Sequence, residues 1–381
     1  LEQLLPAISG MTWQHLIMIG VGVTLIYLAI AKKYEPTLLL PMGFGAILVN
    51  IPLSSAITQI DPATGEALEG VLNIFFDAGI ATEIFPLLIF IAIGAMIDFS
   101  SLFRNPSLLL FGAAAQFGIF MTMVLAALLG YDIREAASIG IIGAADGPTS
   151  IVVASRFAPH MLGPISVAAY SYMALVPIIQ PPVIKLLTSR KERLIRMKTD
   201  ANRQISKKAL IAFPIVITIT AGLIAPSSLA LVGFLMFGNL IRECGVLNKL
   251  SLSAQNELSS LVTILLGITI ASTMTADRFI RVDTLIIIGL GLFAFVFDTF
   301  GGVIFAKFLN IFRKEDNKIN PMIGACGISA FPMSARVIHQ MGQKEDPYNY
   351  LLMPAISANV GGQIGSVVAG GIILTLVPLL G

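Results

Sequence analysis

Two similar segments of the chain carry polar side chains within long apolar stretches. Residues 142–156 read IGAADGPTSIVVASR and residues 323–336 read IGACGISAFPMSAR, so each begins Ile-Gly-Ala, contains Pro and Gly, and ends on Arg. The groups in or beside them that could do chemistry include Asp146, Ser329 and Asn320. Carboxylate, hydroxyl and amide oxygens, together with the backbone carbonyls of a broken helix, suit a hard monovalent cation such as Na⁺ better than a soft metal. The residue types therefore predict a sodium site.

Asp146 is the most demanding of these groups, because it lies in an apolar segment. On insertion scales, a carboxylate at the centre of a membrane helix costs about 2.5 kcal/mol or more. It needs a cation, a proton or a basic side chain as a partner, and the alternative is a structural Asp that caps the broken helix. The second segment has Cys326, Gly327 and Ile328 at the matching position. We therefore expect one carboxylate between the two segments.

Two further polar residues have open interpretations. Tyr172 follows the first segment and is either an aromatic residue at the membrane interface or a hydroxyl that faces the site. Asp298 lies about two helical turns before Lys307, and we expect it to face the cytoplasmic interface.

Amide side chains interrupt the last apolar run. Asn359, Gln363 and Ser366 lie in the stretch NVGGQIGS, which corresponds to Gln180-Pro181-Pro182 in the first half. Because both stretches combine polar residues with Gly or Pro, they are predicted to be unwound crossings near the site.

The elements that must position these residues are membrane helices. The chain is 56% hydrophobic and 12% charged, with a mean hydropathy of +0.87, whereas soluble domains are roughly 25% charged. Apolar runs close to 20 residues long predict an all-α polytopic membrane protein with about ten transmembrane helices. A β-barrel is not expected, since the runs are continuous rather than alternating. The ten predicted spans are 14–31, 37–54, 84–98, 106–130, 161–188, 208–224, 226–241, 258–275, 283–307 and 347–380.

Matching residues in the two halves lie at a near-constant spacing. Gly143 and Gly324 are 181 positions apart, and Arg156 and Arg336 are 180 apart. Such spacing is typical of duplicated halves. Paired apolar segments interrupted by Gly or Pro at corresponding positions are the usual pointer to a transporter's midplane site.

The distribution of charge predicts the topology. Residues 190–208 hold eight of the 24 Lys and Arg residues, so this loop is predicted to face the cytoplasm. That orientation requires 136–158 to be a re-entrant hairpin. It also makes 320–340 a second hairpin, which enters the membrane from the opposite side. The two halves are therefore predicted to form an inverted-topology repeat. The acidic loop 55–82 then lies outside. Arg278 and Arg281 also lie outside, which argues mildly against this topology.

The predicted organisation has five parts. They are N-terminal helices (1–55), a first inverted repeat with hairpin 136–158 (84–188), a cytoplasmic basic linker (189–207), a helical hairpin (208–257), and a second inverted repeat with hairpin 320–340 (258–381). The first apolar run ends on Lys32-Lys33 and reads as a retained span rather than a cleaved signal. The two cysteines are too few for a disulfide scaffold.

Several long motifs resemble a known family. GAADGPTSI, KINPMIGACGISAFPMSARV, GNLIRECGV and NVGGQIGS are similar to motifs of the β subunits of biotin-dependent, sodium-pumping decarboxylases. These are membrane subunits of oxaloacetate, methylmalonyl-CoA, glutaconyl-CoA and malonate decarboxylases. The resemblance begins at AKKYEPTLLLPMGFG and covers nearly the whole chain. It implies that a carboxyltransferase α subunit moves CO₂ from the substrate to biotin on a carrier protein, after which the β subunit decarboxylates carboxybiotin, exports Na⁺ and consumes a proton.

The resemblance also implies roles for residues at matching motif positions. It associates Asp146 with Na⁺ and the coupled proton, Ser329 with a Na⁺ or proton step, and Arg336 with the carboxylate of carboxybiotin or the charge of Asp146. The expected Na⁺ site comprises Asp146, Asn320, Gly324, Ser329 and Tyr172, with Arg336 and Asn320 toward carboxybiotin and Asp146, Arg336, Ser329 and Tyr172 in catalysis.

The resemblance extends to partners and location. It implies a biotin carrier protein, the carboxyltransferase α subunit, a small single-span membrane subunit and further copies of the β subunit, in the bacterial inner membrane, with no nucleic acid. The short stretch between 308 and 320 favours the acyl-CoA branch over oxaloacetate. Two alternatives are an elevator-type Na⁺-coupled secondary transporter and a passive membrane anchor. Asp146 argues against the anchor, which has no need of an intramembrane carboxylate.

Overall fold

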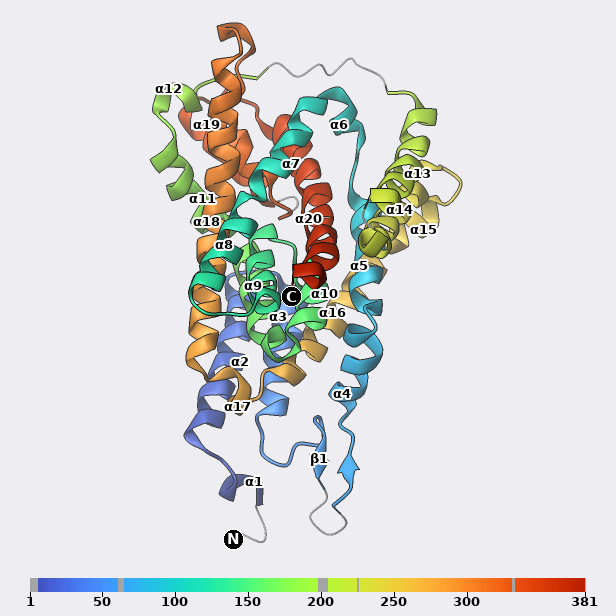
Figure 1. The fold of residues 1–381 in the computed structure, drawn as a ribbon, viewed down its shortest axis with the longest axis vertical. Helices are drawn as coiled ribbons and strands as arrows, with labels where there is room; N and C mark the ends of the chain where they lie inside the picture. Colours follow the sequence, from blue (N-terminus) through green and yellow to red (C-terminus); the bar gives the residue numbers. More distant parts are fainter. Residues whose placement is uncertain (1–5, 61–64, 198–204, 225, 331–332, 381) are drawn as a thin grey trace.

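Long helices make up most of the molecule (Figure 1). The structure is a computed structural model that describes residues 6–60, 65–197, 205–224, 226–330 and 333–380. The described part of the chain has a single pair of short strands, β1 (Gln59–Ile60) and β2 (Ala67–Leu68), which pair antiparallel. The all-α fold expected from the continuous apolar runs is therefore confirmed.

Helices occupy all ten predicted spans. They are α2 (Trp13–Ala31), α3 (Pro36–Val49), α5 (Ile84–Met96), α7 (Leu110–Ala115) with α8 (Phe117–Leu128), α11 (Leu162–Leu187), α13 (Lys207–Ile224), α14 (Leu229–Glu243), α16 (Ser259–Ile270), α18 (Val282–Ile311) and α20 (Leu352–Leu380). The other helices are α1 (Pro6–Ser9), α4 (Val71–Phe75), α6 (Ser100–Arg104), α9 (Ile133–Gly140), α10 (Gly147–Phe157), α12 (Arg190–Arg193), α15 (Asn248–Ser253), α17 (Ala276–Phe279) and α19 (Met333–Glu345).

Not every helix is long enough to cross a membrane alone. Within the described ranges, five helical stretches have the length and apolar composition of a span, and two bent pairs raise the number to seven. The bent pairs are Val71–Ala81 with Ile84–Met96, at 57°, and Pro159–Met173 with Leu175–Leu187, at 66°. A polytopic membrane protein is confirmed, whereas the number ten stays a prediction. Residues 71–81 are helical, so the second half of the expected loop 55–82 was predicted wrongly.

The expected unwinding of two crossings is also wrong. α11 remains helical through Gln180-Pro181-Pro182, and α20 remains helical through Asn359, Gln363 and Ser366. Their polar side chains find partners on neighbouring elements, so the helical backbone can stay intact within the core.

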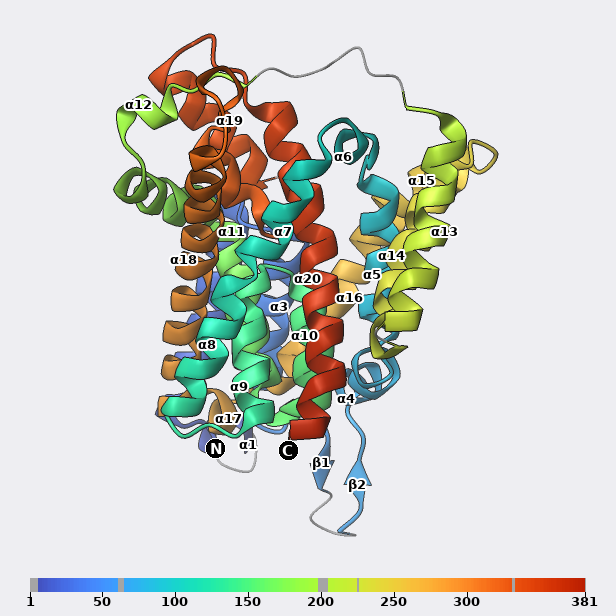
Figure 2. The ribbon, with the colours of Figure 1, turned by 45° about the horizontal axis from the view of Figure 1, so that its top comes forward.

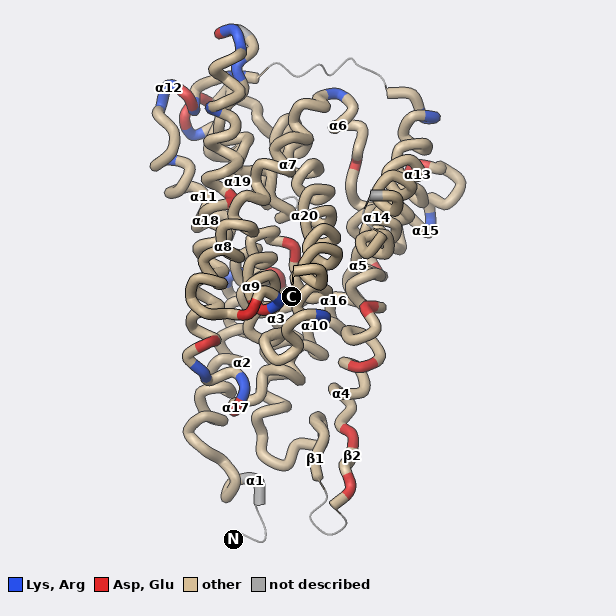
Figure 3. Tube along the Cα trace, viewed as in Figure 1, with Lys and Arg blue, Asp and Glu red and all other residues tan. Residues whose placement is uncertain are grey.

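The two ends of the molecule differ in charge. Lys and Arg gather around α12 and α19 at the upper end, and acidic residues follow β2 and α4 at the lower end (Figure 3). α19 lies at the upper end, whereas α9 and α10 occupy the lower half (Figure 2). The two interrupted segments thus approach the centre from opposite ends. The predicted inverted repeat and the five-part division stay predictions.

Candidate functional site

The first interrupted segment is a helical hairpin with a tight break. α9 is followed by a 3₁₀ turn, η3 (Ile141–Ala144), and by Ala145 in the left-handed region (φ 50°), before α10 begins. A left-handed alanine reverses the chain where a regular helix would continue. α9 has 8 residues and α10 has 11, or about 12 and 16 Å at 1.5 Å per residue. Neither helix can cross a hydrocarbon core of about 30 Å alone.

Asp146 lies at this break and caps α10. Its carboxylate accepts a hydrogen bond from the Thr149 hydroxyl at 2.8 Å and a longer one from the Thr149 backbone N–H at 3.4 Å. The residue is 3% exposed, and no described basic side chain forms an ion pair with it. The capping interpretation is therefore correct, but it leaves the charge of a buried carboxylate without a counter-charge.

The second interrupted segment meets the first. It consists of a 3₁₀ turn, η9 (Pro321–Gly327), the residues after it, and α19. The Ser329 backbone N–H donates to the Ala144 carbonyl at 3.1 Å, and the Ser366 hydroxyl of α20 donates to the same carbonyl at 3.3 Å. The Ser329 hydroxyl lies within reach of the Asp146 carboxylate. The structure therefore brings Asp146 and Ser329 together from positions 183 residues apart.

Side-chain amides hold the carbonyls of the second break. Asn359 donates to the Ile328 carbonyl at 2.7 Å, Gln363 donates to the Ser329 carbonyl, and Gln180 donates to the Ala325 carbonyl at 2.8 Å. The two stretches singled out in the last span and in α11 thus lie at the second break, as expected.

These amides leave oxygen atoms without partners. Asn359 Oδ1, Gln363 Oε1 and Ser329 Oγ are buried and have no hydrogen-bond partner of normal geometry. Buried polar atoms are nearly always satisfied by protein, water or an ion. Carboxylate, hydroxyl and amide oxygens are the ligand types that a hard cation takes. The described residues contain no group of three or more His, Cys, Asp or Glu side chains that could hold a metal ion.

Comparison with known proteins identifies the family of the chain. Residues 14–377 match the family described as the Na⁺-transporting oxaloacetate decarboxylase β subunit. The chain belongs to this family. It is 49% identical to the methylmalonyl-CoA decarboxylase subunit β of Propionigenium modestum, covering 96% of each chain. It is also 49% identical to the glutaconyl-CoA decarboxylase subunit β of Acidaminococcus fermentans, covering 96% of this chain and 94% of the relative. It is 43% identical to the oxaloacetate decarboxylase β chain 2 of Salmonella typhi, covering 99% of each.

Membership confirms the resemblance carried by the sequence motifs. Together with the membrane-length helices, it establishes this β subunit as a multi-pass protein of the bacterial inner membrane. It also supports a decarboxylase and sodium-translocating role.

Asn320 and Tyr172 of this β subunit use their polar atoms elsewhere. The Asn320 amide donates to the carbonyls of Arg193 and Ile195, and its oxygen accepts from the Met322 N–H. The Tyr172 hydroxyl donates to the Ile288 carbonyl on α18. Neither side chain points a free oxygen at Asp146 in this structure, so their expected role as direct ligands lacks geometric support.

Gly324 and Arg336 have different surroundings. Gly324 packs against the backbone of Gly302 on α18, where a Cβ atom on either residue would overlap the other's carbonyl. Arg336 lies exposed on α19, and none of the recorded ion pairs or hydrogen bonds of the described chain involves its side chain. The lack of a side chain at Gly324 therefore allows η9 to pack closely against α18. Arg336, in contrast, is accessible from outside the core.

Two residues near the site were not recognised from the sequence. Asp298 was expected at the cytoplasmic interface, but it is completely buried in α18, beside Gly118 and behind Gly143 of the first break. That expectation was wrong, because the 30-residue length of α18 places Asp298 near its middle. Tyr170, two positions before the expected Tyr172, packs on Gly147 next to Asp146. The sequence could have pointed to Asp298, because it is a carboxylate in the middle of an apolar run. No feature of the sequence pointed to Tyr170.

Proposed function

We propose that this β subunit decarboxylates carboxybiotin and couples that reaction to Na⁺ export, consuming one proton. The observation that carries the proposal is the junction of the two broken segments. There an unpaired carboxylate, Asp146, lies within reach of the hydroxyl of Ser329. Asn359 and Gln363, whose amides hold the carbonyls of Ile328 and Ser329, leave their own amide oxygens without partners. A protein whose task was only to anchor soluble subunits would have no need of such a group of buried oxygens.

We assign the sodium ligands to Asp146, Ser329, Asn359 and Gln363. Three of the expected ligands then hold the surrounding segments in place and do not bind the ion. They are Tyr172, Asn320 and Gly324, whose contacts join α18, η9 and residues 193–195. Arg336 binds the carboxylate of carboxybiotin. A planar guanidinium suits bidentate binding of a carboxylate, and this one has no recorded partner within the described chain.

The proposed complex uses an acyl-CoA substrate. The two acyl-CoA relatives named above are 49% identical to the chain, and the oxaloacetate relative is 43% identical. The partners would be a carboxyltransferase α subunit, a biotin carrier protein that brings the carboxyl group, a small single-span membrane subunit, and further β subunits. The relatives named above are decarboxylase subunits, so we do not propose the elevator-type transporter.

The test is Asp146→Asn in the reconstituted decarboxylase complex. Asn caps a helix about as well as Asp, so the substitution removes the charge and retains the cap. We expect loss of Na⁺-stimulated decarboxylation and of ²²Na⁺ uptake into proteoliposomes. Asp132→Asn is the matched control, because Asp132 caps α9 away from the site and should keep both activities. Normal Na⁺ uptake by Asp146→Asn would refute the proposed function.

A further inference from the structure

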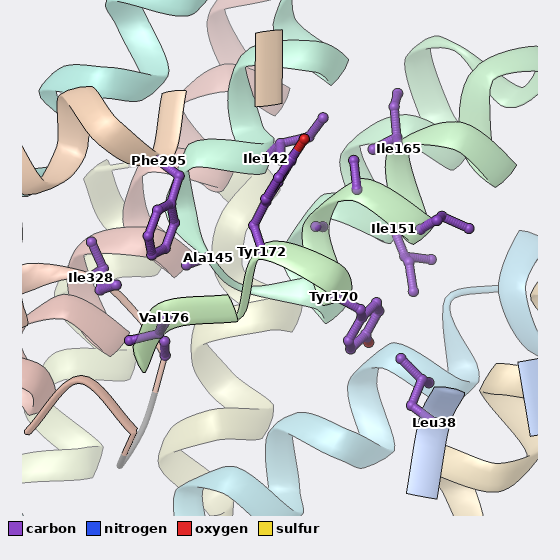
Figure 4. Packing of buried hydrophobic residues seen from close by; sticks show 14 of the residues in the cluster. Leu38, Ile142, Ala145, Ile151, Ile165, Tyr170, Tyr172, Val176, Phe295 and Ile328 are labelled. Atoms are coloured by element: carbon purple, nitrogen blue, oxygen red, sulfur yellow. The ribbon is translucent and has the colours of Figure 1, made fainter. Parts of the chain in front are cut away.

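Two neighbouring tyrosines of α11 point in different directions. Tyr172 lies by Ile142, whereas Tyr170 lies toward Leu38 of α3 (Figure 4). The Tyr172 hydroxyl has a partner in the Ile288 carbonyl. Tyr170 is 4% exposed, and its hydroxyl has no hydrogen-bond partner among the described residues. A buried hydroxyl without a partner is rare in proteins, so this group needs an explanation.

The ring of Tyr170 lies directly against the residue that follows Asp146. A Cβ atom on Gly147 would overlap the ring at Cζ, the carbon that bears the hydroxyl, and at the two adjacent carbons. Gly147 therefore leaves the space that the phenol end of Tyr170 occupies. This packing places the hydroxyl-bearing end of Tyr170 at the first residue of α10, next to the carboxylate that caps that helix.

Two carboxylates lie within electrostatic range of the Tyr170 hydroxyl, those of Asp146 and Glu35. Glu35 belongs to the turn before α3 and is partly exposed, so water can hydrate it. Asp146 is 3% exposed and cannot be hydrated in this way. A carboxylate can accept about four hydrogen bonds, and Asp146 has two recorded, both from Thr149. Asp146 is therefore the acceptor with unused capacity.

We propose that Tyr170 supplies the phenolic hydroxyl of the sodium site and thereby sets its affinity for Na⁺. The hydroxyl has no hydrogen-bond partner among the described residues, so its oxygen is free to take one. With Na⁺ bound, the oxygen of the same hydroxyl faces the ion as a neutral ligand. A hydroxyl can serve as donor and as acceptor, and a phenylalanine ring can do neither. This inference rests on the proposed function, because it assumes that Asp146 binds Na⁺.

The experiment compares Tyr170→Phe with the unaltered protein in the purified decarboxylase complex. Na⁺ binding is measured with ²²Na⁺, and the decarboxylation rate is measured over a range of Na⁺ concentrations. Loss of one polar contact to a charged group, here the contact between the hydroxyl oxygen and Na⁺, weakens binding roughly ten- to a hundredfold. We expect the half-saturating Na⁺ concentration to rise by that factor, while the rate at saturating Na⁺ changes by less than about threefold. The two measurements distinguish weaker Na⁺ binding from a purely structural defect, because a structural defect would lower the rate at saturating Na⁺.

Tyr131→Phe is the matched control. The Tyr131 hydroxyl is also buried and lies near the carboxylates of Asp283 and Glu135, away from the two breaks, so its loss should leave the Na⁺ dependence unchanged. An unchanged half-saturating Na⁺ concentration in Tyr170→Phe would overturn the inference. So would an equal rise in Glu35→Gln, because the hydroxyl would then serve Glu35. The melting temperature of Tyr170→Phe without Na⁺ should match that of the unaltered protein, and a lower value would point to packing instead.

The results separate this inference from the proposed function. If Asp146→Asn loses Na⁺ binding while Tyr170→Phe binds Na⁺ normally, only the role of Tyr170 is wrong. If Asp146→Asn itself binds Na⁺ normally, the sodium site is elsewhere and the proposed function fails first.

Discussion

At the scale of single residues, two buried carboxylates have different surroundings. Asp146 lies at a helix break, within reach of the Ser329 hydroxyl, which has no partner of normal geometry. Asp298 lies within α18 and faces the backbone N–H groups of Gly118 and Ile119, without a hydrogen bond of normal geometry. The Ile119 N–H also donates to the Gln116 carbonyl at 3.1 Å, whereas the first N–H groups of a helix generally lack a partner within it. We infer that Asp298 stabilises the break between α7 and α8 from a neighbouring helix, since N–H groups would repel a cation there.

Substitution of Asp298 tests this structural role. Asp298→Ala should lower the free energy of unfolding by about 1–3 kcal/mol, because it removes the acceptor that faces the buried Gly118 N–H. Asp298→Asn should stay close to the unaltered protein, since the amide oxygen can still accept from it. Thermal denaturation in detergent measures both, with Asp277→Ala as the exposed control. Equal stability of Asp298→Ala and the unaltered protein would contradict the assignment.

At the scale of elements, α18 is the common support of both breaks. On one side it packs against η9, where Gly302 meets Gly324 backbone to backbone. On another it packs against the first break, where Gly143 adjoins Asp298 and Ala294. Only glycine permits an approach this close, because any Cβ atom would overlap the neighbouring backbone. The relative position of the two breaks therefore depends on small residues along one helix.

Two glycines of α18 allow a matched test of this support. Gly302→Ala should push η9 away from α18 and lower the decarboxylation rate at least tenfold, since a displacement of about 1 Å at a site can cost a hundredfold in rate. Gly289→Ala is the control, because a Cβ atom there meets nothing within 4 Å. If the two variants have equal activity, the spacing between α18 and η9 is not critical.

A second element fastens the start of η9 to the end of α19. Residues 188–197 lie across the start of η9 and the end of α19. Arg193 pairs with Glu345 at 2.7 Å, with side chains 13% and 18% exposed, and Asn320 binds the carbonyls of Arg193 and Ile195. The Asn320 amide therefore holds this segment.

Removal of the Glu345 charge should release this segment. Glu345→Gln leaves the half-buried guanidinium of Arg193 without its counter-charge, which is more costly than loss of a surface pair. We expect several-fold faster tryptic cleavage after Arg193 and Arg196, mapped by mass spectrometry. Glu315→Gln is the control, because Glu315 is 85% exposed in its pair with Lys318 and such pairs contribute about 0–1 kcal/mol. Equal cleavage of the two variants would show that the ion pair does not hold the segment.

At the scale of the whole molecule, charge separates the two ends and assigns them to the two sides of the membrane. The basic end around α12 and α19 is expected in the cytoplasm. The helices of the first hairpin are then reached from outside and α19 from inside. Two breaks that enter from opposite sides and meet at Ser329 and Ala144 give the site two possible routes to water, as alternating access requires.

Labelling of single cysteines tests this topology. In a background with Cys244 and Cys326 replaced by Ser, Arg134→Cys and His160→Cys should react with a membrane-impermeant maleimide from the outside. Lys344→Cys should react only from the cytoplasmic side. All three positions are exposed in the structure. Reaction of positions 134 and 160 from opposite sides would mean that this segment crosses the membrane, and the re-entrant hairpin would be wrong.

The sequence by itself determined the class of the protein and most of its helices. Continuous apolar runs, Gly and Pro breaks and clustered positive charge are local properties, and local properties decide whether a segment enters a membrane. For the same reason Asp146 and Ser329 were recognisable, because a polar residue in an apolar run is visible without knowledge of its neighbours.

Only the tertiary structure decided which polar groups meet. Asn359 and Gln363 were expected near the site, but their free oxygens follow from hydrogen bonds to Ile328 and Ser329, just after η9. Tyr170 and Tyr172 differ by two positions in one helix, and this rotation sends one toward Asp146 and the other toward α18. The position of Asp298 depends on close backbone contacts between segments more than 150 residues apart. Such contacts depend on how helices pack against one another, and the local pattern of a sequence does not contain that information.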